Sequence, residues 1–235
     1  MNSLPPSQTT IAPHLKLWYY PLSLLGANFG RNAVGLSLPN GDLLIHSSGP
    51  FSEEEVAELR SMGTPRYLLE ATPLHDTFLR KGSATFPEAS LLAHPSLFSQ
   101  AKGMAGQSDP ALKASSLKRQ GIHLIPIQGL FQGEEWALYE ERSQTLILAD
   151  MLVQVDEPVP ALSRPFVRMA GLTPGVPSID RLFRLCIKHR TTFRKSIPPL
   201  LDLPIQTLIP AHGVPIQEQA KDILLAELET HDLLP

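Results

Sequence analysis

The chain has 235 residues, and 43% of them are hydrophobic, so it is long enough and apolar enough to bury a sizeable core. Its 20 basic and 23 acidic residues leave a formal net charge of −3, and the lack of a basic block argues against a nucleic-acid partner. A single cysteine, Cys186, excludes an internal disulfide and a metal cage made of several thiolates.

The first part of the chain is polar and contains prolines. We expect residues 1–13 to form a flexible tail, followed by one domain over residues 14–235. The start of the sequence lacks the basic residues and apolar core of a signal peptide, and no apolar segment approaches membrane-spanning length. These features predict a cytoplasmic protein with no membrane partner.

The first half of the chain alternates between short strands and helices. Asn40 and Gly41 separate two apolar segments and predict a hairpin turn, because Asn-Gly tolerates positive φ. Ser52 and Glu55 have the spacing of a capping box, so a helix should follow and end near Gly63. We expect strands at residues 16–20, 33–38, 43–46, 65–70 and 90–93, and a short helix or turn at 76–82.

The second half continues this alternation around one proline-rich connection. Residues 156–177 contain five prolines, and we expect an extended, irregular segment there. We expect strands at residues 122–127, 136–140, 145–149 and 206–209, and helices at 110–119, 179–195 and 217–229. Helix 179–195 is basic, and its charges form either a solvated face or a site for an anionic partner. The interleaved elements predict an α/β domain of two packed sheets with helices outside.

Three potential metal ligands, far apart in the sequence, each follow an apolar segment. His75, Asp150 and His212 come after residues 65–69, 144–149 and 207–211. A short apolar segment that ends in a polar residue usually places that residue at the rim of a sheet, where ligands gather. Two imidazoles and one carboxylate are a sufficient donor set for a first-row transition metal. The sequence therefore predicts a metal site if the three side chains meet.

Each of these residues also has a simpler explanation when taken alone. His75 is also explained as a hydrogen-bonding loop residue, and Asp150 as a carboxylate bonded to backbone amides. His212 precedes Gly213, which permits a tight turn. If the three residues had unrelated structural roles, however, there would be no reason for each of them to follow a predicted strand. Their shared position therefore favours a common site.

At these residues the sequence resembles the metallo-β-lactamase fold superfamily. The resemblance spans about residues 14–216 and includes the opening hairpin, the strand that ends at Asp150, and the Ala211-His212-Gly213 segment. It implies an α/β fold in the form of a four-layer αββα sandwich, with two mixed β-sheets flanked by helices. It also implies one or two bound zinc or iron ions and hydrolysis of esters, amides, thioesters or phosphodiesters.

The first metal-binding loop departs from the pattern of this family. The family has H-x-H-x-D-H, whereas the corresponding residues here are Glu70-Ala71-Thr72-Pro73-Leu74-His75. His75 remains, Leu74 replaces the aspartate, and residues 125–135 lack the next family histidine. The resemblance therefore implies at most a mononuclear zinc or iron site, with His75, Asp150 and His212 as its ligands.

Two main functions are consistent with this pattern. One is a metal-dependent hydrolase of a small molecule, with Asp150, Glu70 and His46 as the candidate catalytic residues. His46 replaces an aspartate of the family and is either a polar group facing the cleft or an ordinary hydrogen-bonding residue. The other is a non-catalytic scaffold without metal that serves binding or assembly. An iron site for redox or oxygen chemistry is a third hypothesis.

Overall fold

The structure, a computed structural model, describes residues 7–235, and its chain divides into two compact units. The C-terminal unit consists of Pro21–Arg31 and Ile125–Pro235. The N-terminal unit consists of the described residues up to Tyr20 and of Asn32–Leu124. Each unit has its own sheet and its own apolar core.

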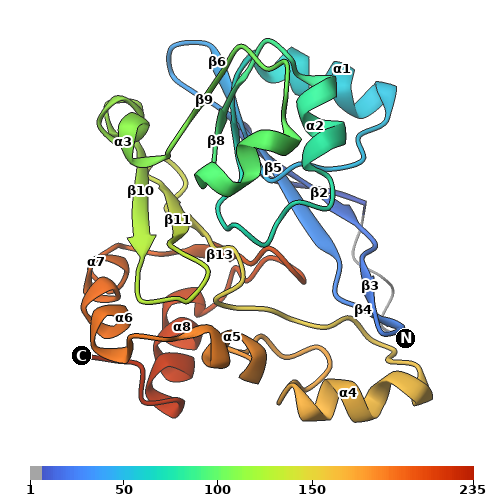
Figure 1. Ribbon diagram of the computed structural model, residues 1–235, viewed down its shortest axis with the longest axis vertical. Helices are drawn as coiled ribbons and strands as arrows, with labels where there is room; N and C mark the ends of the chain where they lie inside the picture. Colours follow the sequence, from blue (N-terminus) through green and yellow to red (C-terminus); the bar gives the residue numbers. More distant parts are fainter. Residues whose placement is uncertain (1–6) are drawn as a thin grey trace. The chain divides into compact units, whose positions relative to one another are not determined.

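The N-terminal unit is built on a seven-stranded mixed sheet with the order β1-β2-β5-β6-β7-β8-β9 (Figure 1). Strands β5 and β6 form the antiparallel hairpin expected around Gly41, whose φ is +85°. From β6 to β9 the neighbouring strands run parallel. The strands are β1 (Gln8–Ala12), β2 (Leu15–Tyr20), β5 (Arg31–Ser37), β6 (Asp42–His46), β7 (Thr64–Leu69), β8 (Ser90–Leu92) and β9 (Gly106–Ser108).

Helices pack on this sheet through an apolar core. Helix α1 begins with the expected capping box, in which Ser52 accepts from the amide of Glu55 and the Glu55 carboxylate accepts from the amide of Ser52. Trp18, Leu59 and Phe86 are among the fully buried residues of the core. The helices are α1 (Glu53–Met62), α2 (Leu79–Thr85), η1 (Pro95–Gln100) and α3 (Ala111–Lys118).

The C-terminal unit contains a four-stranded mixed sheet with the order β10-β11-β12-β13 and a separate two-stranded hairpin. Strands β11 and β12 are antiparallel, whereas β12 and β13 are parallel. The strands are β10 (Ile122–Ile127), β11 (Glu135–Glu140), β12 (Thr145–Ile147) and β13 (Thr207–Ile209), with β3 (Ser23–Leu24) and β4 (Ala27–Asn28) in the hairpin.

The four C-terminal helices of this unit share one apolar core with the sheet. Leu146, Phe193 and Leu208 are completely buried in that core. A smaller apolar cluster joins Phe29, Val155, Val167 and Leu172. The helices are η2 (Ala161–Ser163), α4 (Arg164–Met169), α5 (Arg181–Cys186), α6 (Arg190–Ser196), α7 (Pro198–Leu201) and α8 (Ala220–Thr230).

The architecture confirms an α/β fold with two mixed sheets and flanking helices. Residues 1–6 of the expected tail lie outside the described residues, but residues 8–12 form strand β1, which pairs with β2. A single domain over residues 14–235 stays a prediction. No helix in the described part of the chain is long and apolar enough to cross a membrane.

Two expectations for the C-terminal unit were wrong. The connection 156–177 is not irregular throughout, because it contains helix α4. Pro165 lies in the first turn of this helix, where backbone amides make no hydrogen bond within the helix, so the N–H that proline lacks is not needed there. The expected helix 179–195 is broken into α5 and α6, because the amides of Lys188 and His189 bond to the carbonyl of Gly129 instead of continuing the helix.

Candidate metal centre

Asp150 and His212 lie at the same end of two neighbouring parallel strands. Ile147 pairs with Ile209 in the register of β12 and β13, and the pairing continues through the bond from the Leu148 amide to the Ile209 carbonyl. Asp150 and His212 each come three residues after this pair. Parallel register therefore brings the carboxylate and the imidazole together, as the sequence predicted for these two residues.

The His212 ring is held by the backbone on one side and faces Asp150 on the other. Its Nδ1 lies 2.6 Å from the carbonyl oxygen of Gly30, and its Nε2 lies 3.3 Å from Oδ1 of Asp150. A carbonyl oxygen only accepts hydrogen bonds, so Nδ1 must carry the proton. In the neutral ring, Nε2 then presents its lone pair to the Asp150 carboxylate.

Packing around His212 leaves its ring little freedom. The Phe29 ring meets it edge-on, with centroids 6.5 Å apart and planes at 87°. The His212 carbonyl accepts from the amide of Gln154. Gly213 has φ +109°, and a Cβ at this position would come within 2.5 Å of Cβ of Gln154. Glycine is therefore needed immediately after His212.

Glu135 supports the segment that carries Asp150, and the sequence did not reveal it. It opens β11 and is 1% exposed, and its Oε1 accepts from the amide of Met151 at 3.1 Å. Its Oε2 has no hydrogen-bond partner among the described residues. Burial and then the negative charge of Asp150 raise the pKa of Glu135 well above its usual range. The feature of the sequence that could have identified this residue is its position directly before Trp136, at the start of an apolar strand.

The other candidate residues belong to the N-terminal unit. His75 follows β7 in a buried turn, in which its amide donates to the Thr72 carbonyl. His46 ends β6 and is buried, with Nδ1 lying 3.3 Å from the Ser47 hydroxyl. Glu70 is also buried, and its Oε1 accepts from the amide of Ser48 at 2.7 Å.

His46 and Glu70 occupy the carboxyl ends of adjacent parallel strands, since His46 is in register with Leu69. The structure thus brings Asp150 and His212 together within one unit and brings His46 and Glu70 to one edge of the other unit's sheet. The roles of His75, His46 and Glu70 beside the Asp150–His212 pair stay predictions. A histidine and a carboxylate at this distance are a candidate metal site.

Comparison with known proteins identifies the fold. No family model matches the sequence, and no curated protein matches it. The metal-soaked Flv1 flavodiiron core from Synechocystis sp. PCC6803 is similar over 94% of this chain, with 13% identity and a TM-score of 0.63. This chain spans 60% of the length of that protein.

Two structures with a more similar length also match. The DIM-1 metallo-β-lactamase exposed to ceftazidime covers 95% of this chain and is itself covered over 96%, with 12% identity and a TM-score of 0.59. The match to a metallo-β-lactamase from Erythrobacter litoralis covers 95% of this chain and 92% of the lactamase, with 13% identity and a TM-score of 0.57. The chain therefore has the fold of the metallo-β-lactamase superfamily.

Proposed function

We propose that the protein is a metal-dependent hydrolase of small molecules with one metal ion, held by His75, Asp150 and His212. The observation that carries this proposal is the contact between Nε2 of His212 and Oδ1 of Asp150 at 3.3 Å. Two groups that both present lone pairs repel each other unless a proton or another cation lies between them. A metal ion satisfies this requirement.

The hydrogen bonding behind the pair also fits metal binding. A histidine that binds a metal usually donates its other ring N–H to a carbonyl or carboxylate, which fixes the tautomer and the ring orientation. Nδ1 of His212 makes such a contact with the Gly30 carbonyl at 2.6 Å. The Glu135 carboxyl in turn supports the Asp150 segment through the Met151 amide. Each residue of the pair is thus held in place by a second group.

His75 is the proposed third ligand and comes from the N-terminal unit. Glu70 and Thr72 stand where the family has the first two histidines of this loop, so the imidazole donors of a second ion are missing from it. When bound, a zinc or iron ion lowers the pKa of a coordinated water and polarises an ester-like or phosphoryl group. Asp150 and His212 hold the ion, and Glu70 and His46 are the proposed groups for proton transfer. A cytoplasmic location belongs to the same proposal.

A second candidate is a scaffold without metal. It is favoured by Leu74, which stands where the family has a metal-binding aspartate, and the 3.3 Å contact fits it as well, because a proton on Nε2 of His212 would take the place of the metal ion. The two candidates therefore differ in whether a metal ion or a proton lies between Nε2 of His212 and Oδ1 of Asp150. The metal content of the purified protein distinguishes them.

The deciding experiment is metal analysis of the whole protein purified without added metal. We expect about one zinc or iron per chain, lost in the His75→Ala, His212→Ala double variant. His189→Ala is the matched control, since His189 is an exposed histidine of the C-terminal unit. Absence of metal, together with a melting temperature that a chelator does not change, would establish the scaffold instead.

A further inference from the structure

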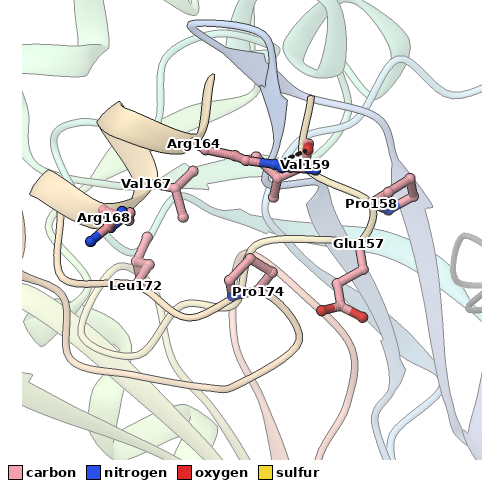
Figure 2. Close-up of a pocket in the computed structure, with 8 residues that line it drawn as sticks. All are labelled: Glu157, Pro158, Val159, Arg164, Val167, Arg168, Leu172 and Pro174. Atoms are coloured by element: carbon pink, nitrogen blue, oxygen red, sulfur yellow. Dashed lines mark hydrogen bonds between the residues drawn. The ribbon is translucent and has the colours of Figure 1, made fainter. Parts of the chain in front are cut away.

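A pocket of about 850 Å³ lies within the C-terminal unit (Figure 2). It is formed by helix α4 and by the segments on either side of this helix, residues 157–159 and 172–174. Its volume lies within the range of roughly 300–1,000 Å³ that is typical of small-molecule sites. The pocket contains none of the proposed metal ligands, so it is a separate feature of the unit.

The floor of this pocket is apolar. Val159, Val167 and Leu172 line it, and all three are buried members of the cluster that includes Phe29. Figure 2 shows Val167 projecting from α4 on the side where Leu172 and Pro174 lie. The surrounding core holds these side chains in place, so the floor presents a fixed apolar surface to a ligand.

The side of the pocket formed by α4 is positively charged. Arg164 and Arg168 are one helical turn apart, and both are exposed. Nε of Arg164 lies 3.4 Å from the carbonyl of Val159, which directs this side chain along the pocket. Glu157 is the acidic residue of the lining and lies beside Gly175. Two guanidinium groups against one carboxylate leave the lining with one excess positive charge.

We propose that this pocket binds a small molecule with an apolar body and a single carboxylate, of the size of a medium-chain fatty acid. The apolar body contacts Val159, Val167 and Leu172, and the carboxylate pairs with the arginines of α4. Guanidinium groups suit this role because their planar donors match the two oxygens of a carboxylate. The single excess charge favours a monoanion over a doubly charged phosphate.

A homologous series of ligands tests both parts of the proposal. Hexanoate, octanoate and decanoate would be titrated by calorimetry into the whole protein, below the concentrations at which they form micelles. Burial of each added methylene should tighten Kd by up to about fourfold. The neutral analogue 1-octanol should bind about fivefold more weakly than octanoate, because it lacks the charge that pairs with the arginines.

Variants locate the site. The Arg164→Gln, Arg168→Gln double variant should weaken octanoate binding about fivefold and leave 1-octanol binding unchanged. Arg119→Gln is the matched control, because Arg119 is an exposed arginine of the N-terminal unit. Pro174→Trp places a large ring in the half-buried wall and should abolish binding of both ligands.

Three results would overturn the proposal: no saturable binding, no dependence on chain length, or an equal loss in the Arg119 variant. The test is independent of the metal, since chelator-treated protein should bind octanoate with the same Kd. Failure of the pocket is therefore distinguishable from failure of the proposed metal site.

Discussion

Replacement of Gly213 by alanine tests whether the backbone after His212 is shaped for this site. The residue has φ +109°, and a Cβ would come within 2.5 Å of Cβ of Gln154. The positive φ should cost about 1 kcal/mol for an L-residue. The clash with a packed neighbour should add about 1–3 kcal/mol. We therefore expect Gly213→Ala to lower the free energy of unfolding by about 3 kcal/mol.

Gly41→Ala separates the two contributions. Gly41 also has a positive φ, +85°, but no heavy atom of the described residues outside Asn40–Asp42 lies within 4 Å of a Cβ built there. This variant should lose only about 1 kcal/mol. Urea unfolding of both variants measures the difference, and metal content shows whether His212 has moved. Equal losses in the two variants would refute the claim that Gln154 crowds this position.

Three further changes probe the supports of the fold and the site. Burial raises the pKa of Glu135 in the folded protein. The contribution of Glu135 to the free energy of unfolding is therefore largest below the unfolded pKa near 4.5, and it falls as the pH rises toward the folded pKa, by at most about 1.4 kcal/mol per pH unit. Glu135→Gln keeps the acceptor for the Met151 amide, and its unfolding free energy should lose that pH dependence; an unchanged pH profile in urea titrations would contradict this. Ser52→Ala removes the cap of α1 and should cost about 1 kcal/mol in urea unfolding, whereas a loss below about 0.3 kcal/mol would show that the box is not stabilising. Phe193→Ala removes a fully buried ring that meets Phe183 edge-on, and calorimetry should show a loss of about 3–5 kcal/mol; a loss near 1 kcal/mol would mean that the core collapses around the gap.

Features set by local sequence were predictable. The Asn40-Gly41 turn and the Ser52–Glu55 capping box depend on residues within one turn of each other, and both occur in the structure. The pairing of Asp150 with His212 was also predictable. Each follows an apolar strand, and adjacent parallel strands end at the same edge of a sheet.

Features set by distant contacts were not predictable. The break between α5 and α6 depends on the carbonyl of Gly129, which lies far from that helix in sequence. Glu135 was missed because its burial and its bond to the Met151 amide arise only from tertiary packing. Helix α4 was missed because the five prolines of residues 156–177 suggested an irregular segment, although Pro165 occupies the one helical turn that accepts proline.

X-ray absorption of the zinc-loaded protein tests the proposed metal centre most directly, because it reports the nitrogen and oxygen atoms that surround the ion. We expect two imidazoles in the wild type and one in His75→Ala, with the His189→Ala control unchanged. An identical spectrum for the wild type and His75→Ala, or loss of bound zinc in the His189 control alone, would contradict a site shared by His75, Asp150 and His212.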